Sequence, residues 1–214
     1  MNNNQETFDT WNNIAAVYQD KFMNLDLYNE TYDYICNAVT TPKAKLLEIG
    51  CGPGNITKYL LSKRPDFDIF GIDIAPNMIE LAKANNPTAS FAVMDTRDIK
   101  LLDTRYDAII GGFCLPYLSQ RERDELISQS YEMLNAEGLI YLSFVEGEPA
   151  QSGFKTGGYG RVYFNYHNLD ELKAQLIKTG FESIEIFKVP YKTSETAFDI
   201  HTILIAKRTP IWHL

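Results

Sequence analysis

Three glycines and two acidic residues lie at spacings that could hold a ligand. Gly50, Gly52 and Gly54 fall within five positions, just after an apolar run that contains Glu48. Glycine allows backbone conformations, and a close approach to a ligand, that a Cβ would obstruct. Asp73 follows about 20 residues later, where an acid can accept hydrogen bonds from both hydroxyls of a ribose. These residues predict a site for a nucleoside.

The spacing of the glycines also bears on the rest of the ligand. The dinucleotide fingerprint is GxGxxG, in which a helix N-terminus receives a pyrophosphate. Here the third glycine comes one position early, and Asn55 stands where it would be. Glu48 would also put a negative charge beside a pyrophosphate and disfavour it. The loop therefore favours an uncharged or cationic ligand, and a nicotinamide-dependent oxidoreductase is kept as an alternative.

The elements that must position these residues alternate between strand and helix. Apolar patterning predicts strands over 43–49, 68–73, 90–95, 106–111 and 139–145, and helices over 8–20, 26–39, 55–63, 76–84 and from Ser119 to about 134. A further helix starts at Asn168 and stops at Gly180. The last two strands, 181–189 and 198–208, are joined by too few residues for a parallel crossover. The prediction is an α/β fold with a doubly wound, mostly parallel, seven-stranded Rossmann-like sheet and one antiparallel strand near an edge.

Length and composition predict a single domain over residues 1–214, because 214 residues with 45% hydrophobic content can bury one sizeable core. Residues 1–40 are expected to form a helical cover that acts as a lid over the site. Residues 147–167, rich in glycine and aromatic side chains, are expected to form an inserted loop over the end of the sheet.

Charge and cysteine content restrict the partners and the compartment. A net charge of −8 argues against binding to nucleic-acid backbones, which attract clustered Lys and Arg. Cys36, Cys51 and Cys114 form no CxxC pair, so neither a disulfide framework nor a metal site is expected. The sequence contains no signal-peptide pattern and no stretch of about 20 apolar residues. We therefore expect a cytoplasmic protein with reduced thiols, no membrane partner and no metal.

Five segments, taken in order, resemble the motifs of class I S-adenosylmethionine (SAM)-dependent methyltransferases. They are LLEIGCGPG, GIDIAPNMIELAK, MDTRDI, YDAIIGGFCLPYL and LNAEGLIYLSF, and the match covers about residues 8–208. The resemblance implies SAM as cofactor, S-adenosylhomocysteine (SAH) as product and methyl transfer as the reaction. No NPPY or DPPY follows the fourth strand, so methylation of amino groups on nucleobases or glutamine is not indicated. A small-molecule acceptor is expected.

The resemblance also implies a set of site residues. The cofactor would meet Tyr18, Glu48, Gly50, Cys51, Gly52, Gly54, Asn55, Asp73, Ile74, Met78, Met94, Asp95, Thr96 and Phe113. The acceptor would meet Leu115, Tyr117, Tyr159, Arg161 and Tyr163, the last three from the inserted loop. An aromatic ring such as that of Tyr18 near the sulfonium would gain cation–π attraction.

The chemistry itself demands few side chains, because methyl transfer is an in-line displacement that depends on positioning. A general base is needed only if the acceptor arrives protonated. His167 and Tyr166 are weak candidates, whereas His201 is interpreted as a satisfied core or edge histidine and His213 as a tail residue without a role. A SAM-binding regulatory protein without turnover is a further alternative. The acceptor, the methylated atom (O, N, C or S) and the choice between monomer and homodimer stay open.

Overall fold

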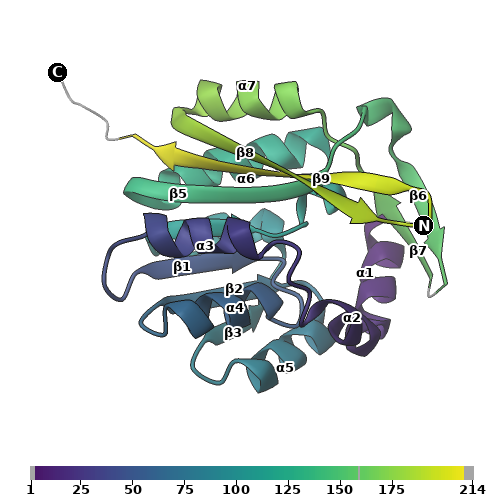
Figure 1. The fold of residues 1–214 in the computed structure, drawn as a ribbon, viewed down its shortest axis with the longest axis horizontal. Helices are drawn as coiled ribbons and strands as arrows, with labels where there is room; N and C mark the ends of the chain where they lie inside the picture. The colour runs from purple at the N-terminus through teal and green to yellow at the C-terminus, as the bar shows by residue number, and fades with distance from the viewer. Residues whose placement is uncertain (1–2, 159, 210–214) are drawn as a thin grey trace.

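A seven-stranded sheet forms the centre of the computed structural model, which describes residues 3–158 and 160–209 (Figure 1). The strand order is β3-β2-β1-β4-β5-β9-β8. The strands are β1 (Lys45–Ile49), β2 (Asp68–Asp73), β3 (Ser90–Val93), β4 (Tyr106–Gly111), β5 (Leu134–Val145), β8 (Phe181–Lys192) and β9 (Phe198–Arg208). Among the described strands of this sheet, β9 alone runs in the direction opposite to the other strands. The predicted doubly wound, mostly parallel sheet is thereby confirmed.

Helices pack on the sheet and cover one end of it. They are α1 (Asn3–Asn13), α2 (Ala15–Phe22), α3 (Asn29–Ala38), α4 (Asn55–Lys63), α5 (Pro76–Asn85), α6 (Gln120–Met133) and α7 (Leu169–Thr179). The predicted helix over 8–20 is two helices, because the chain leaves helical geometry at Ile14. The predicted helix start at Ser119 is confirmed, and a capping box between Ser119 and Glu122 fixes it. The fifth strand begins at Leu134, directly after α6 and ahead of the predicted start at 139.

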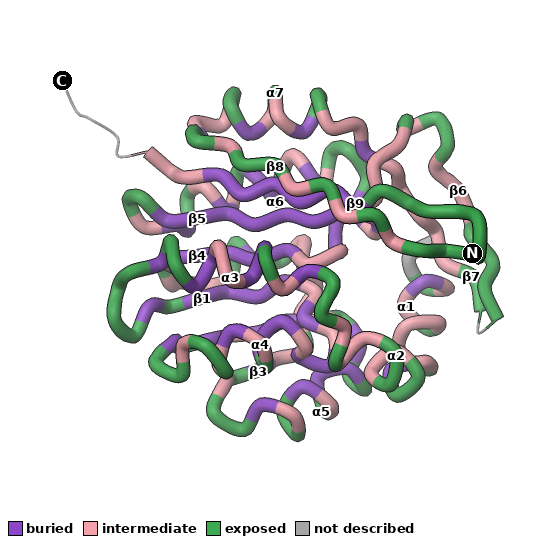
Figure 2. Tube along the Cα trace, viewed as in Figure 1, coloured by how far each residue is buried: buried purple, intermediate pink, exposed green. Residues whose placement is uncertain are grey.

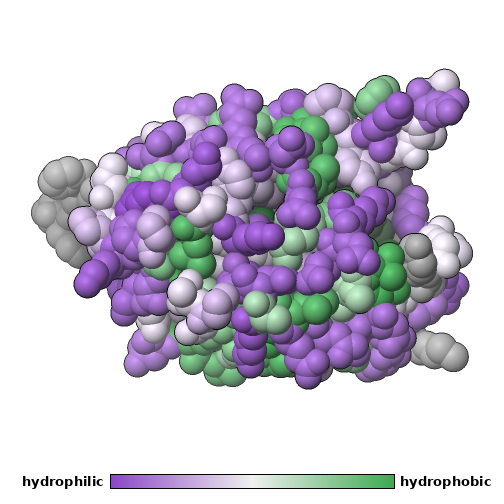
Figure 3. Space-filling model, turned by 60° about the horizontal axis from the view of Figure 1, so that its bottom comes forward, coloured by the Kyte–Doolittle hydropathy of each residue, from purple (hydrophilic) through white to green (hydrophobic). Residues whose placement is uncertain are grey.

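The core lies on both faces of the sheet. Side chains alternate along β1, so Leu47 joins the cluster with α6 and α7, while Leu46 joins the cluster with α3 and α4. Figure 2 shows burial along β1, β4 and β5, and exposure along most of β8. On the face seen in Figure 3, hydrophobic side chains are interrupted by hydrophilic ones. No helix of the described residues is both long enough and apolar enough to cross a membrane.

The segment 147–167 contains a two-stranded hairpin, β6 (Gly153–Gly157) and β7 (Gly160–Phe164), outside the main sheet. This hairpin lies against α1 (Figure 1). Thr10 Oγ1 donates to the Arg161 carbonyl at 2.9 Å, and the Tyr163 amide donates to Thr7 Oγ1 at 2.9 Å. The hairpin and the N-terminal helix therefore form one cover over the carboxyl end of the sheet.

Candidate active site

A cavity lies where β1, β2 and β4 end, under α1, α2 and β7. Parallel strands bring their carboxyl ends to one edge of a sheet, so loops far apart in sequence meet there. The lining residues are Thr7, Phe8, Trp11, Tyr18, Gly50, Gly52, Asp73, Ile74, Met78, Asp95, Thr96, Arg97, Gly112, Phe113, Cys114, Tyr117, Leu118, Tyr163 and Asn165.

The glycine loop forms one wall of this cavity. Gly50, Gly52 and Gly54 have φ values of 63°, 52° and 79°, in the left-handed region that favours glycine. A Cβ on Gly54 would lie 2.3 Å from Asn86 Nδ2, so this position has no room for a side chain. A Cβ on Gly52 would lie 3.6 Å from the Tyr18 ring, which covers the loop from α2. The loop thus presents bare backbone to the cavity beneath an aromatic ring.

Asp73 joins the glycine loop to the second strand. Its Oδ2 accepts from the Gly52 amide and its Oδ1 from the Ala75 amide, each at 2.9 Å. Burial raises the pKa of this carboxyl, although the backbone donors oppose the rise. A carboxylate oxygen has two lone pairs, so each oxygen keeps capacity for one further donor from the cavity. The geometry suits recognition of two adjacent hydroxyls.

Glu48 lies beneath the loop and not on the cavity wall. Only 1% of the residue is exposed, and Thr57 Oγ1 donates to its Oε2. Burial raises the pKa of Glu48 to about 7; hydrogen bonds from Thr57 lower it, and the nearby Asp73 charge raises it. A cation in the cavity would favour the ionised form of this buried acid.

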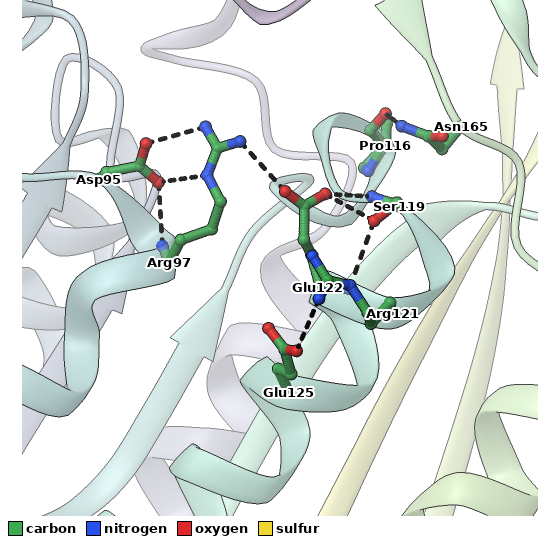
Figure 4. A network of polar contacts seen from close by, with 8 residues as sticks. All are labelled: Asp95, Arg97, Pro116, Ser119, Arg121, Glu122, Glu125 and Asn165. Atoms are coloured by element: carbon green, nitrogen blue, oxygen red, sulfur yellow. Dashed lines mark hydrogen bonds and ion pairs between the residues drawn. The ribbon is translucent and has the colours of Figure 1, made fainter.

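Asp95 lines the cavity with its charge already paired (Figure 4). Arg97 contacts it through the backbone amide at 2.9 Å, through Nε at 2.8 Å and through Nη2 at 2.8 Å. The same guanidinium bonds Glu122 Oε1 at 3.1 Å. Arg97 was not among the predicted site residues, although the segment MDTRDI places an arginine two residues after the acid. Asp95 therefore caps the turn and pairs with Arg97, which leaves its carboxylate less capacity to accept hydrogen bonds from the cofactor it was predicted to meet.

Aromatic rings form the rest of the wall. Trp11 meets Tyr18 and Tyr117 edge-on, with ring centroids 5.6 Å apart in both pairs. Burial raises the pKa of Tyr18 and of Tyr117, so both phenols stay neutral. Helical spacing places Phe8, Trp11 and Tyr18 on one face, but only Tyr18 was predicted as a site residue. Both Phe8 and Trp11 line the cavity, because that face is the underside of the cover.

The structure brings together about half of the predicted residues. The cavity is lined by Tyr18, Gly50, Gly52, Asp73, Ile74, Met78, Asp95, Thr96, Phe113, Tyr117 and Tyr163. Cys51 and Met94 pack into the core, Gly54 contacts Asn86, and Asn55 lines a separate groove beside α3. Leu115 is fully buried. Tyr159 and His213 lie outside the described residues.

The two weak base candidates and the predicted acceptor arginine lie away from the cavity. His167 is fully buried, with Nε2 2.8 Å from the Leu115 carbonyl and Nδ1 3.4 Å from Arg123 Nη1. Tyr166 lines a different groove, next to Lys155. Arg161 forms a two-pronged ion pair with Glu6, at 2.7 and 2.8 Å. These contacts correct the expectations that His167 or Tyr166 serves as base and that Arg161 meets the acceptor.

Comparisons with known proteins agree with this geometry. Residues 46–138 match the family model described as a methyltransferase domain. A carboxy-S-adenosyl-L-methionine synthase of Campylobacter jejuni is 22% identical over 203 residues, which cover 89% of this chain and 83% of the relative. The 235L protein of Invertebrate iridescent virus 6, a predicted methyltransferase, is 30% identical over 116 residues; the match spans 54% of this chain and 42% of the viral protein. The magnesium protoporphyrin IX methyltransferase of Synechocystis PCC 6803, crystallised with bound SAM, aligns with a TM-score of 0.71 at 17% identity, covering 98% of both chains.

The sheet order, the glycine loop and the acid that ends β2 define the class I SAM-dependent methyltransferase fold. Residues 46–138 match the methyltransferase domain model, and the whole chain has the fold of a solved SAM-dependent methyltransferase. No group of three or more His, Cys, Asp or Glu residues among those described could hold a metal ion.

Proposed function

We propose that the protein transfers the methyl group of SAM to a small, flat molecule that is neutral or cationic. The observation that supports this most is the continuity of the cavity, in which Asp73 and the glycine loop share one space with Trp11, Tyr117 and Tyr163. Flat aromatic walls with few polar groups are typical of sites for small molecules. The Synechocystis relative is itself named for a small-molecule substrate.

The residues on the cofactor side are proposed to contact different parts of SAM. We infer that Asp73 accepts the ribose hydroxyls, Ile74 and Met78 contact the adenine face, and the amides of Gly50 and Gly52 face the methionine part. SAM supplies an electrophilic methyl group on a positively charged sulfur. Tyr18 and Phe113 offer ring faces to that charge, and ionised Glu48 adds a buried negative charge behind the loop.

Charge on the acceptor side limits what binds there. The one cationic side chain among the described lining residues is Arg97, which is paired with both Asp95 and Glu122. A strongly anionic acceptor would therefore find no free cationic side chain to pair with in this lining. A carboxylated form of SAM would also add negative charge close to Glu48 and Asp73. A methyl-bearing cofactor with a neutral or cationic acceptor therefore suits this cavity better than carboxyl transfer.

The direct test is a screen of the purified protein with radiolabelled SAM against fractionated metabolites, combined with calorimetry. We expect binding of SAM and SAH, no binding of NAD, and transfer of label to a small molecule. Binding of NAD without a response to SAM would favour an oxidoreductase. Binding of SAM without transfer to any fraction would favour a regulatory SAM-binding protein.

Tyr18→Ala is expected to weaken binding of SAM more than binding of SAH. Both ligands lose packing against the ring, but only SAM carries the sulfonium that cation–π attraction favours, by about 0.5–2 kcal/mol. Calorimetric titration of both ligands against wild type and variant measures the difference. Equal losses for SAM and SAH would show that the ring only packs.

Tyr163→Ala is expected to change the acceptor KM or kcat and to leave SAM affinity near that of the wild type. The reason is that Tyr163 reaches the cavity from β7, whereas the glycine loop and Asp73, which we assign to the cofactor, lie at the ends of β1 and β2. The matched control is Val162→Ala, next to it in the same strand and outside the cavity lining. A Tyr163 variant with wild-type turnover would place the acceptor elsewhere.

We further propose that residues 1–214 act as a single domain with the hairpin on the acceptor side, and that the protein works in the cytoplasm as a monomer or homodimer. Three free, buried cysteines are compatible with a reducing compartment. Sedimentation analysis would decide between monomer and dimer.

A further inference from the structure

One carboxamide, that of Asn165, lines the cavity and has no part in the residue roles proposed above. Asn165 follows β7 directly, two residues after Tyr163, which lines the same cavity. It is the only amide side chain among the described lining residues. A neutral polar group among aromatic rings is suited to fix the orientation of a flat ligand. The contacts of Asn165 show how far it can do so.

Two hydrogen bonds to a single carbonyl fix how the Asn165 amide is turned (Figure 4). The backbone amide of Asn165 donates to the Pro116 carbonyl at 2.7 Å, and its side-chain Nδ2 donates to the same oxygen at 3.1 Å. Turning the carboxamide over would put Oδ1 against that carbonyl, and two acceptors repel each other. Nδ2 therefore stays beside Pro116, and Oδ1 lies on the other side of the amide.

The side-chain oxygen of Asn165 is left as an acceptor. Within the part of the chain that the structure describes, Oδ1 accepts no hydrogen bond, and it is not sealed away from solvent. Because the residue lines the cavity, a molecule bound there can reach this oxygen. An amide oxygen accepts hydrogen bonds and cannot donate them, so an N–H or O–H group is what satisfies it.

The wall that carries Asn165 is braced on its buried side by His167, which is fully buried. His167 Nε2 lies 2.8 Å from the Leu115 carbonyl, and this nitrogen must carry the hydrogen because a carbonyl only accepts. Nδ1 faces Arg123 Nη1 at 3.4 Å, and burial lowers the pKa of His167. A neutral imidazole in one tautomer thus holds the Leu115 carbonyl, while Asn165 holds the next carbonyl along the chain.

The turn that is held in this way also supplies an aromatic ring to the cavity. It is the 3₁₀ helix η2 (Leu115–Tyr117), whose last residue lines the cavity. The position of Tyr117 and that of the Asn165 amide are therefore fixed by the same contacts. A site whose polar and flat groups are fixed before the ligand arrives spends less free energy on ordering them.

We propose that Asn165 selects the methyl acceptor, with Oδ1 accepting a hydrogen bond from an N–H or O–H on the edge of a flat ring while Tyr117 and Tyr163 contact the ring itself. This inference rests on the proposed function and narrows its acceptor to a neutral or cationic ring that carries a hydrogen-bond donor. Asn165 orients the ring and takes no proton from it. A ring without a donor leaves Oδ1 unpaired and binds less tightly.

The test uses two probes of nearly the same shape: indole, which has a ring N–H, and benzofuran, which has an oxygen in its place. Their affinities for the SAH-bound protein are measured by NMR titration, so that no turnover is required. The wild type should bind indole about tenfold more tightly than benzofuran, because benzofuran leaves the amide oxygen unpaired. Asn165→Leu and Asn165→Ala should bind the two probes equally well.

The ratio of the two affinities separates recognition from a structural role. Lost packing would weaken both probes by the same factor, whereas a lost contact with Oδ1 removes the preference for indole. Both substitutions keep the backbone bond to Pro116, and calorimetric titration with SAH shows that each variant is folded. Asn135→Leu is the matched control, because its Nδ2 also donates once, to Asp107 at 2.9 Å, from the far end of β5 and outside the cavity lining.

The expected result is a preference for indole that Asn135→Leu keeps and both Asn165 variants lose, with SAH affinity at the wild-type value throughout. A wild type that does not prefer indole, or a preference that survives in the Asn165 variants, would overturn this inference and leave the proposed function standing. If the preference is confirmed but the labelled-SAM screen finds no methylated small molecule, the proposed function fails and the cavity holds a ligand that is not a methyl acceptor.

Discussion

Asp73→Ala is expected to lower SAM affinity about 100-fold. Two charge-assisted hydrogen bonds to ribose hydroxyls are worth about 1.5–3 kcal/mol each before relaxation. The same change removes the acceptor for the Gly52 and Ala75 amides, so the loop also loses its link to β2. Calorimetric titration with SAM measures the loss directly.

Two variants separate these contributions. Asp73→Asn keeps one amide acceptor and removes the charge, so its loss should fall between those of wild type and Asp73→Ala. Asp68→Ala changes an exposed aspartate at the opposite end of the same strand and should leave SAM binding unchanged. An Asp73→Ala protein that binds SAM like the wild type would remove Asp73 from the proposed ribose contact.

Glu48→Gln is expected to stabilise the ligand-free protein at neutral pH and above. The folded pKa of Glu48, about 7, lies above the ordinary value of 4.5, so folding favours the protonated acid. That stabilisation is complete below the unfolded pKa and is lost as pH rises through the folded one. The shift corresponds to about 3 kcal/mol, which glutamine, with no proton to lose, would retain. Urea unfolding at a series of pH values measures the difference, with exposed Glu80→Gln on α5 as control.

The same substitution, Glu48→Gln, should weaken the binding of SAM although it stabilises the ligand-free protein. SAM carries positive charge, so its binding favours ionised Glu48, and wild-type affinity should rise with pH until about 7 and then level off. The Glu48→Gln variant should bind SAM more weakly than the wild type at pH 8. Its SAM affinity should not rise with pH as that of the wild type does. A variant with unchanged affinity and the same pH dependence would show that the buried charge does not reach the ligand.

The sheet could be predicted from sequence because its signals are local. Apolar runs ending at Ile49, Asp73 and Gly111 fix where parallel strands stop, and Gly50 to Gly54 mark the turn that follows the first of them. The start of β5 was misplaced because the segment NAEG, which is typical of a turn, lies within the strand and carries Glu137 at a φ of 65°. The register with β4 jumps from Leu134 to Leu139, so residues 135–138 form an irregularity inside the strand and do not end it.

The site was only partly predictable, because its remaining contacts join distant parts of the chain. Arg161 meets Glu6 across 155 positions, and no periodicity shows that pairing in advance. His167 appeared free in the sequence, yet Arg123 and the Leu115 carbonyl occupy both of its nitrogens. Asp73 was predictable because strand, acid and helix start lie together within a few residues.

The pairing of α1 with β7 has a consequence for chimeras between related enzymes. Both segments lie outside residues 46–138, one on each side, and they are fastened by Glu6 with Arg161 and by Thr7 and Thr10 with the β7 backbone. Grafting a foreign N-terminal helix alone would leave Arg161 without its carboxylate and set an unmatched surface against the hairpin. If the hairpin holds acceptor preference, as proposed, we expect that α1 and the hairpin must be exchanged together, while the glycine loop and Asp73 are kept.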